Sequence, residues 1–194
     1  MLSVLRSKTT TPPEFRRHLQ QISILLLAHA SARWETEPRE IETPLARAPG
    51  QKLKRPVVFV PILRAGQAMV DGMSRVLPEA GVGHIGIYRD EKTLMPTTYF
   101  SRLPEKFVTE QVLLLDPMLA TGGSAVAALQ ALKARSATRI QFICLVACPE
   151  GIAKVSEAHP DVEIICAAVD PGLDHRGYIL PGLGDAGDRY FGTA

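Results

Sequence analysis

Five short, almost continuous apolar runs alternate along the chain with segments whose apolar residues recur every three or four positions. The apolar runs occupy residues 57–63, 85–88, 112–115, 140–147 and 162–169. Helical spacing is found at residues 67–77, 123–135 and 150–158. Continuous apolar runs are typical of strands buried on both faces, and parallel strands need a crossover, usually a helix, between them. The pattern therefore predicts an α/β fold with a central, mostly parallel sheet flanked by helices.

A long amphipathic helix is predicted near the amino terminus, at about residues 12–34. Thr11 and Glu14 can form a capping box, and Pro12 suits the first helical position. Apolar residues at helical spacing form one stripe that faces the core: Phe15, Leu19, Ile22, Leu26 and Ala30.

Three segments lack the pattern of buried elements. Residues 35–55 are polar and rich in proline, which predicts loops or short strands. Residues 90–107 mix polar and aromatic side chains with prolines, which predicts a hairpin or arm outside the core. Residues 170–194 are rich in glycine and predict a loop. With a length of 194 residues, the chain is expected to form a single domain covering residues 1–194.

The balance of charges makes one class of partner unexpected. The chain has 22 Lys and Arg residues against 20 Asp and Glu residues, a net charge of +2. A protein that binds nucleic acid through its phosphates usually carries a larger basic surplus. With 46% hydrophobic residues the composition is that of a globular domain, and no nucleic-acid partner is expected.

The sequence also bears on the cellular compartment. The longest apolar stretch near the start, residues 22–32, is interrupted by polar residues and is shorter than the ~20 residues that span a bilayer. Residues 1–6 do not resemble a secretory signal. The three cysteines lie in apolar runs, which suits reduced thiols better than disulfides. We expect a cytoplasmic protein without membrane association.

The most informative segment joins a buried strand to the start of a helix through small residues. The run 112–115 ends at Asp116, and Thr121, Gly122, Gly123 and Ser124 precede the helix. A helix N-terminus offers free N–H groups and a positive dipole end, so it can hold a phosphate without a basic side chain. Glycines let the backbone approach the anion. Asp116 follows the carboxyl end of its strand, where ligands of open α/β sheets bind.

Two other phosphate-binding motifs do not fit this loop. A Walker A loop requires Gly-Lys-Ser/Thr, and no lysine is present here. A dinucleotide fingerprint requires Gly-x-Gly-x-x-Gly, which the glycine pair does not supply. From the residues alone, a capped strand-to-helix turn with an incidental aspartate stays open as the alternative to a phosphate site.

Four segments, in order along the chain, resemble motifs of the type I phosphoribosyltransferases, in the form typical of the uracil phosphoribosyltransferase family. The segment Asp116-Pro117-Met118-Leu119-Ala120-Thr121-Gly122-Gly123-Ser124 resembles the family's phosphoribosyl-diphosphate loop. Segments 61–66 and 86–91 resemble its two arginine motifs, and segment 177–188 resembles its uracil-binding loop. The resemblance implies a type I fold with a hairpin arm at about 90–107 and a base-binding hood loop at about 170–190.

The resemblance also implies roles for single residues. In the family, residues matching Arg64, Arg89 and the loop 116–124 contact 5-phosphoribosyl 1-diphosphate. The 5-phosphate would rest on residues 120–124, and Asp116 would accept hydrogen bonds from the ribose hydroxyls. Asp116, Asp185 and Arg89 are the expected catalytic residues. From residue type alone, Arg64 and Arg89 would each be interpreted as a solvated surface cation. Their positions after buried strands favour phosphate binding instead.

By the same resemblance, uracil contacts Ile179, Gly184, Asp185 and Ala186, and Asp185 also reaches the phosphoribosyl substrate. Backbone groups of a rigid loop can read the donor and acceptor edge of uracil and disfavour the amino group of cytosine. On composition alone, an ordinary surface loop is the alternative. The implied reaction converts uracil and 5-phosphoribosyl 1-diphosphate into UMP and diphosphate. Mg²⁺ is expected on the substrate diphosphate, with no metal site of the protein's own.

Assembly and regulation stay open at this point. A homodimer or higher homo-oligomer is expected, and GTP, which activates some members of the family, is a candidate effector. Segment 90–107 either closes over the diphosphate or contacts a partner subunit, since Met95, Tyr99 and Phe100 are apolar. A competing function is an RNA-binding regulator that senses pyrimidine nucleotides, which predicts a basic face bearing aromatic residues.

We interpret the histidines, the single tryptophan and one basic cluster as structural or solvated residues. Five histidines show no metal-ligand spacing and are interpreted as surface or helix-end residues: His18, His29, His84, His159 and His175. Trp34 is interpreted as a packing residue. The cluster of Lys52, Lys54 and Arg55 is interpreted as solvated, although an effector nucleotide could use it.

Overall fold

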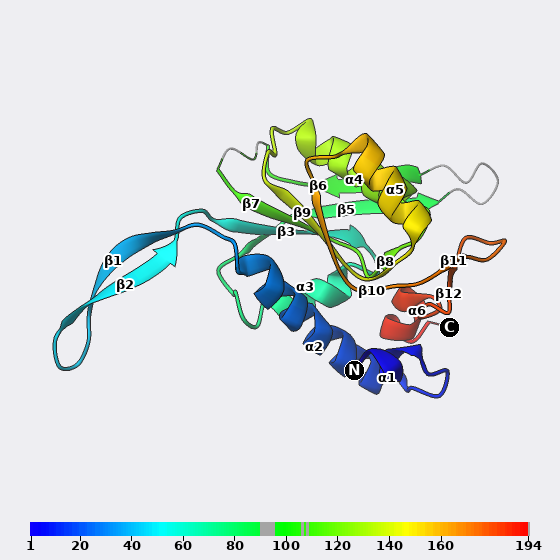
Figure 1. Cartoon of the computed structure of the whole chain (residues 1–194), viewed down its shortest axis with the longest axis horizontal. Helices are drawn as coiled ribbons and strands as arrows, with labels where there is room; N and C mark the ends of the chain where they lie inside the picture. Colours follow the sequence, from blue (N-terminus) through cyan, green and yellow to red (C-terminus); the bar gives the residue numbers. More distant parts are fainter. Residues whose placement is uncertain (90–95, 106, 108, 194) are drawn as a thin grey trace.

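An eight-stranded sheet forms the centre of the molecule (Figure 1). The computed structural model describes residues 1–89, 96–105, 107 and 109–193. The main path of the sheet runs, in spatial order, through β10 (Glu163–Val169), β9 (Ile140–Ala147), β7 (Gln111–Leu115), β3 (Val57–Leu63), β5 (His84–Arg89) and β6 (Pro96–Arg102). The short strands β4 (Gly81–Val82) and β8 (Met118–Leu119) pair with β3 and β9. Among the described residues, only β5 and β6 pair antiparallel within this sheet, which confirms the mostly parallel α/β architecture.

Helices cover both faces of this sheet because successive strand residues point to opposite sides. The covering helices are α2 (Pro12–Ser31), α3 (Gln67–Met73), α4 (Gly123–Lys133) and α5 (Pro149–Ala158). On β7, Leu113 and Leu115 pack into one core with α2 and α3. Val112 and Leu114 pack into a second core with α4 and α5. The result is three layers, in which α4 and α5 lie on one side of the sheet and α2 and α3 on the other (Figure 1).

The predicted capping box starts α2. The Glu14 carboxylate accepts hydrogen bonds from the Thr11 N–H at 3.1 Å and from the Thr11 hydroxyl at 2.8 Å. The helix ends at Ser31, slightly before the predicted end, and α3 ends at Met73 rather than near residue 77. Within the described ranges, no helix is both long enough and apolar enough to cross a membrane.

A two-stranded hairpin projects from the body, formed by β1 (Thr36–Glu42) and β2 (Arg47–Leu53) (Figure 1). The strands pair antiparallel, with Thr36 opposite Leu53. The sequence predicts loops or short strands here. Residues 90–107 are expected to form a hairpin or arm outside the core. In the described part of that segment β6 pairs antiparallel with β5, as in a hairpin, and residues 97–102 are exposed, whereas Phe107 is buried in the second core. Residues 90–95 lie outside the described part. The long hairpin was missed because most of its residues are exposed, so neither strand shows apolar alternation.

The two ends of the chain meet beside the carboxyl edge of the sheet (Figure 1). They contribute α1 (Leu2–Arg6), the short pair β11 (Gly172–Leu173) and β12 (Ile179–Leu180), and α6 (Ala186–Phe191). The prediction of a loop throughout 170–194 is wrong at α6. Asp185 caps this helix by accepting a hydrogen bond from the Asp188 N–H at 2.8 Å, and Gly192 ends it with a left-handed φ of 74°. Six helical residues beginning Ala-Gly are too few to show a periodic stripe.

Candidate active site

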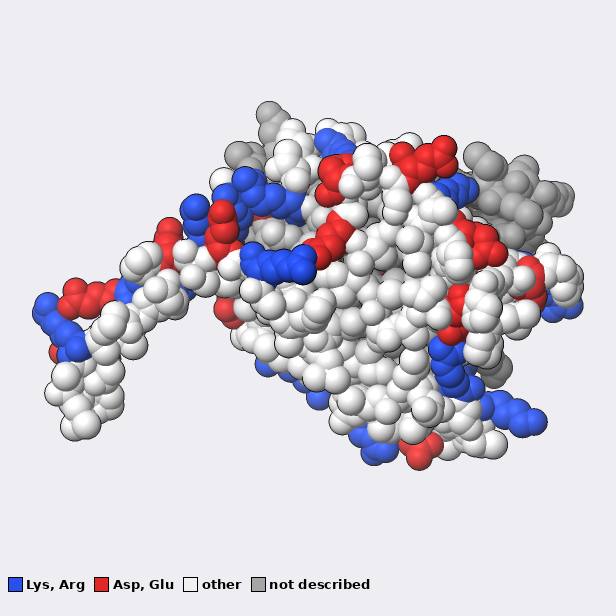
Figure 2. Space-filling view, in the orientation of Figure 1, with Lys and Arg blue, Asp and Glu red and all other residues white. Residues whose placement is uncertain are grey.

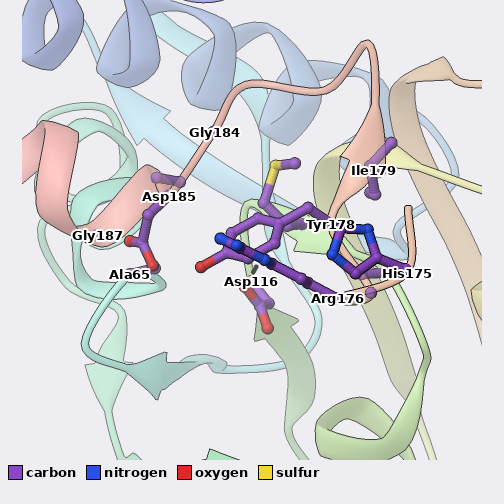
Figure 3. Close-up of a pocket in the computed structure, with 13 residues that line it drawn as sticks. Ala65, Asp116, His175, Arg176, Tyr178, Ile179, Gly184, Asp185 and Gly187 are labelled. Atoms are coloured by element: carbon purple, nitrogen blue, oxygen red, sulfur yellow. Dashed lines mark hydrogen bonds between the residues drawn. The ribbon is translucent and has the colours of Figure 1, made fainter. Parts of the chain in front are cut away.

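Three parallel strands end at the same edge of the sheet and bring the sequence motifs together. Pro61 of β3 lies opposite Leu115 of β7, and Leu115 lies opposite Ile143 of β9. A cavity of about 660 Å³ opens at this edge (Figure 3). It is lined by Ala65, Asp116, Met118, Ala120, the run 175–179 and the run 184–187. All four residues predicted to contact uracil are among these lining residues.

A second, smaller cavity of about 150 Å³ lies at the amino end of α4. It is lined by Asp116 and by residues 118–125, so it adjoins the larger cavity at Asp116, Met118 and Ala120. Gly122 caps α4 in a left-handed conformation with φ 76°, which a side chain would disfavour. The first N–H groups of a helix have no partners within the helix and carry the positive end of its dipole. This cavity is therefore suited to an anion.

The loop between β7 and α4 is held in place by β9 and α5. The Pro117 carbonyl accepts hydrogen bonds from the N–H groups of Leu145 and Val146 at 2.9 and 3.0 Å. Pro117 is buried and lines neither cavity, unlike the rest of the predicted phosphate loop. A methyl group at Gly151 would clash with the Ala120 and Leu119 carbonyls, so α5 packs directly against the loop. Spacing alone gave no signal for the contribution of Gly151.

Asp116 lies where the two cavities meet. Its Oδ1 accepts a hydrogen bond from the Met118 N–H at 3.3 Å. Burial raises the pKa of the Asp116 carboxyl to about 7; the Met118 hydrogen bond opposes this rise, and the charge of Asp185 adds to it. The carboxyl therefore changes charge close to neutral pH, and a bound donor such as a hydroxyl would favour the ionised form.

The segment 170–187 forms a hood over the larger cavity, and a partly buried ion pair fastens it. Arg6 reaches Asp170 through two hydrogen bonds of 2.6 and 2.7 Å. Asp170 also accepts the Gly182 N–H at 2.8 Å, and Arg6 donates to the Gly182 carbonyl at 3.2 Å. Gly182 has φ 58°, and a methyl group there would clash with the Ile179 carbonyl. The amino-terminal helix thus fixes the turn that carries the lining residues.

Arg189 provides a second fastening for the hood. Its guanidinium donates to the carbonyls of Leu183 and Ser7, both at 2.7 Å, and lies 4.4 Å from the centre of the Phe15 ring. Neither this contact nor the pair of Arg6 and Asp170 was predicted from sequence. Apart from Arg189 and Leu183, the residues in these contacts are 164 or more positions apart along the chain, so no local sequence pattern predicts the contacts.

The two predicted arginines are placed differently from the loop residues. Arg64 lines neither cavity, although the next residue, Ala65, does. Its guanidinium bonds Asp188 of α6 at 2.8 Å and lies 5.9 Å from the Phe191 ring centre. Arg89 is the last residue of β5, and its side chain lies outside the described part. Asp185 lines the larger cavity while it caps α6.

Three lining side chains were not named as site residues from the sequence: His175, Arg176 and Tyr178, the last of which lies within the matched segment 177–188. The turn that carries them is organised by Asp174, whose carboxylate accepts the N–H groups of Arg176 at 2.9 Å and Tyr178 at 2.8 Å. Figure 3 shows Arg176 and Tyr178 reaching across the cavity toward the side of Asp185. The interpretation of His175 as a plain surface residue is therefore incomplete. Its position beside the matched segment 177–188 was the available signal.

Solved structures of low sequence identity share this fold. A hypoxanthine phosphoribosyltransferase from Staphylococcus aureus is 14% identical, with a TM-score of 0.55 over 87% of this chain and 85% of the other. A purine phosphoribosyltransferase from Pyrococcus horikoshii is 16% identical, with a TM-score of 0.51 over 69% of this chain and 75% of the other. The fold is that of the type I phosphoribosyltransferases.

Within this class the chain belongs to the uracil phosphoribosyltransferase family, whose model matches residues 1–193. It is 51% identical to the uracil phosphoribosyltransferases of Dictyoglomus turgidum and Streptococcus mutans, over 99% of this chain and 93% and 92% of theirs. The solved AQ2163 protein from Aquifex aeolicus is 37% identical, with a TM-score of 0.94 over 99% of this chain and 92% of that one.

Proposed function

We propose that this chain transfers the phosphoribosyl group of 5-phosphoribosyl 1-diphosphate to uracil, forming UMP and diphosphate in pyrimidine salvage. The observation that carries the proposal is that two cavities meet at Asp116. One is the smaller cavity at the amino end of α4, which is suited to an anion and is called the cradle below, and the other is the larger cavity under the hood. The product UMP has the same layout, with a phosphate at one end, a diol in the middle and the base beyond. The relatives named uracil phosphoribosyltransferase support the choice of base.

The phosphoribosyl substrate is assigned to the cradle and its rim. Its proposed contacts are Arg64, Arg89, Asp185 and the loop from Asp116 to Ser124. The N–H groups of residues 120–124 hold the 5-phosphate, and the Asp116 carboxylate accepts hydrogen bonds from the ribose hydroxyls. Pro117 acts through its backbone, because its carbonyl ties the loop to β9.

Uracil is assigned to the hood side of the larger cavity, at Ile179, Gly184, Asp185 and Ala186. Ile179 is buried and gives the ring an apolar wall. Backbone N–H and C=O groups of the fastened loop then read the polar edge of the base. A rigid backbone cannot turn a donor into an acceptor, so a base with the opposite pattern leaves buried polar groups unpaired.

Catalysis rests on position and charge. The uracil ring nitrogen bonds to the anomeric carbon as the bond from that carbon to diphosphate breaks, and the ring proton is released. Holding both substrates in line removes much of the entropic barrier. Asp116 and Asp185, two carboxylates on the same cavity, stabilise the cationic character that builds on the sugar. Arg89 is proposed to stabilise the leaving charge.

Mg²⁺ is proposed as the cofactor, carried on the substrate diphosphate. When bound there, it would supply positive charge that neutralises the leaving diphosphate. The carboxylate oxygens of Asp116 and Asp185 are the kind of hard ligand that Mg²⁺ prefers, and both line the larger cavity. These two residues are the ones that would help to hold it. Removal of divalent ions with a chelator should therefore abolish turnover, and added Mg²⁺ should restore it.

The deciding experiment is product formation from labelled uracil, with hypoxanthine and cytosine alongside. Labelled UMP should form from uracil and from neither competitor at a comparable rate. UMP formation that equals the uncatalysed background, with 5-phosphoribosyl 1-diphosphate and Mg²⁺ present, would overturn the proposal. A purine nucleotide as the main product would overturn the assignment of the base.

A cytoplasmic location and assembly into a homodimer or larger homo-oligomer belong to the same proposal. The three cysteines are free thiols, which fits a reducing compartment. Tyr99 and Phe100 on β6 are exposed apolar side chains, which suits either a partner subunit or closure over the diphosphate. GTP as an effector stays a prediction from sequence.

Gly151→Ala should disturb the phosphate cradle from behind. The added methyl group meets two backbone carbonyls, so either α5 or the loop must shift. We expect a loss of stability of about 1–3 kcal/mol and a rise in KM for 5-phosphoribosyl 1-diphosphate that exceeds any rise for uracil. Urea unfolding and steady-state kinetics measure both. Gly172→Ala, which faces the Glu150 side chain instead, is the control and should change neither strongly.

Arg176→Gln should weaken binding of the anionic substrate. The exposed Arg176 side chain lines the larger cavity together with the carboxyls of Asp116 and Asp185. Removing its charge should raise KM for 5-phosphoribosyl 1-diphosphate by about 3- to 10-fold, most visibly at low salt. Arg75→Gln, two residues beyond α3, is the control for a general loss of positive charge. Equal effects in both variants would contradict a local role.

A further inference from the structure

The short helix α6 begins at the larger cavity and ends in the protein core. Its capping residue Asp185 and its first two residues, Ala186 and Gly187, line that cavity. Tyr190 is 3% exposed and packs in the core with α2 and α3. The helical rise of about 1.5 Å per residue places Tyr190 roughly 7.5 Å from Asp185 along the axis. The way the core holds Tyr190 therefore influences where the Asp185 carboxylate lies in the cavity.

The Tyr190 hydroxyl group belongs to a hydrogen-bonded network that joins three helices. It donates to Asp71 Oδ2 of α3 at 2.7 Å and accepts from Gln20 Nε2 of α2 at 2.7 Å. The other oxygen of the same carboxylate, Asp71 Oδ1, accepts from Gln67 Nε2 at 3.0 Å. Burial, together with the hydrogen bond to Asp71, raises the pKa of the Tyr190 phenol to about 12, so the hydroxyl remains a donor at neutral pH. One donor and one acceptor thus fix its orientation.

The network continues to the sheet and rests on closely packed backbone. Gln67 Oε1 lies 3.2 Å from Nε2 of His84, the first residue of β5. Since a carbonyl oxygen only accepts, the histidine is the donor in this contact. A methyl group at Gly72 would lie 2.6 Å from the Gln20 carbonyl oxygen, so α3 packs directly against the backbone of α2 beside Asp71. The Tyr190 hydroxyl therefore ties α6 to a tightly packed frame.

Other polar contacts of α6 lie at the surface or hold the hood. The side chains of Arg64 and Asp188 form an ion pair but are 57% and 34% exposed. On the face drawn in Figure 2, basic side chains likewise lie at the surface beside acidic ones. Exposed ion pairs are individually weak. Arg189 donates to the carbonyl of Leu183, which belongs to the hood. Tyr190 supplies the buried polar contact between α6 and the helices beneath it.

The Tyr190 hydroxyl adds direction to a contact that its ring already makes. The ring packs edge-on against Phe191, with the ring centres 5.1 Å apart. A phenylalanine would fill the same apolar space, but apolar burial is not directional, whereas a hydrogen bond is. The hydroxyl therefore restrains the rotation of α6 about its axis. In an enzyme, a displacement of about 1 Å in a positioned group can cost roughly 100-fold in rate.

We propose that Tyr190 and Asp71 are positioning residues for the transfer reaction. Their hydrogen bond sets the rotation of α6, and this rotation places the Asp185 carboxylate beside the sugar and the Ala186 backbone beside uracil. Neither Tyr190 nor Asp71 is among the lining residues of the larger cavity or the cradle, so both act through α6. This inference rests on the proposed function, because the roles of Asp185 and Ala186 belong to it.

Tyr190→Phe removes the hydroxyl and keeps the ring. We expect kcat/KM for uracil to fall about 5- to 20-fold, with KM for 5-phosphoribosyl 1-diphosphate changed less than about twofold, because the cradle is built by α4. Ser23→Ala is the matched control, since it removes a buried hydroxyl of α2 that donates to the Leu19 carbonyl at 2.8 Å. It should change neither constant. Equal kinetic effects of the two variants, or equal changes in both KM values in Tyr190→Phe, overturn the proposal.

Variants of Asp71 test the hydrogen bond itself. Asp71→Asn keeps an oxygen that accepts from Tyr190 and should retain most of the wild-type kcat/KM. Asp71→Ala should lose about as much as Tyr190→Phe. The double variant should be no worse than Asp71→Ala, because both substitutions remove the same bond. Additive losses in the double variant, or an equal loss in Asp71→Asn and Asp71→Ala, contradict the proposal.

Hydrogen exchange of the full chain shows how firmly α6 is held without using the reaction. The Asp188 N–H donates to Asp185 Oδ1 at 2.8 Å in the native helix. Tyr190→Phe should speed exchange in peptides covering residues 185–191 by about fivefold or more, and Ser23→Ala should not. If the wild type forms no UMP, the proposed function fails, while faster exchange in Tyr190→Phe still supports the positioning of α6. Unchanged exchange in this variant overturns the positioning role whether or not UMP forms.

Discussion

Asp116→Asn should remove most of the transferase activity while it stabilises the fold above neutral pH. Loss of a charged acceptor for the ribose hydroxyls should lower kcat/KM for 5-phosphoribosyl 1-diphosphate by about 10- to 100-fold. The KM for uracil should change much less, because uracil is assigned to the hood. In the wild type, kcat/KM should rise as the pH passes about 7, where Asp116 ionises. The asparagine variant should lack this component of the pH profile.

The stability effect has the opposite sign to the activity effect. Burial raises the pKa of Asp116 from 3.8 to about 7, so between these pH values the folded state holds a proton that the unfolded state has lost. Linkage then lowers the stability of the wild type as the pH rises from about 4 to 7, by roughly 4 kcal/mol at most. Asparagine does not titrate, so its advantage should grow over this range and stay constant above it.

Urea unfolding of both proteins at pH 5, 7 and 8.5 measures this difference. Asp161→Asn is the control, because Asp161 is an exposed carboxylate whose hydrogen bond with Lys133 holds its pKa low. Its stability relative to the wild type should not depend on pH above 5. Parallel curves for the wild type and Asp116→Asn would show that Asp116 does not titrate with a raised pKa.

The sequence was sufficient for the parts of the fold that repeat a local pattern. The strand at 140–147 is predicted to the residue, because all eight of its residues are buried and apolar character runs through it, apart from Gln141. Gln141 accepts a hydrogen bond from Trp34, but a single polar residue in an apolar run does not indicate which residue it will bond. Patterns of burial are visible locally, whereas pairs of polar groups are not.

In the candidate site, too, contiguous motifs can be recognised from sequence, whereas contacts between distant residues cannot. The loop 116–124 and the hood segment are contiguous motifs that can be located from sequence, and the residues named in them, except Pro117, line adjoining cavities. The groups that hold the hood could not be predicted, because Arg6 and Asp170 lie 164 residues apart. The projecting hairpin was missed for a related reason. Its exposed strands bury little within this chain, so they lack the apolar alternation that identifies a strand.

Asp170→Asn should strongly destabilise the fold. The Asp170 side chain is 6% exposed and holds both Arg6 and the Gly182 N–H. Replacing the carboxylate leaves the Arg6 charge, 24% exposed, without its partner. Removing one member of a buried pair typically costs about 3–5 kcal/mol, and partial exposure of Arg6 places the expected loss at the lower end. Glu40→Gln, in an exposed pair on the hairpin, should lose less than about 1 kcal/mol.

The pH dependence of the unfolding free energy and the changes in the two KM values together show why Asp170→Asn loses stability. The hydrogen bond from Arg6 holds the pKa of Asp170 below its ordinary value, so the pair stabilises the fold above about pH 4 and weakens only in acid. The deficit of Asp170→Asn should therefore stay constant from pH 5 to 8. Because the hood loses its charged fastening to Arg6, KM for uracil should rise more than KM for 5-phosphoribosyl 1-diphosphate. Equal changes in both KM values would mean that the pair supports the whole fold rather than the uracil hood.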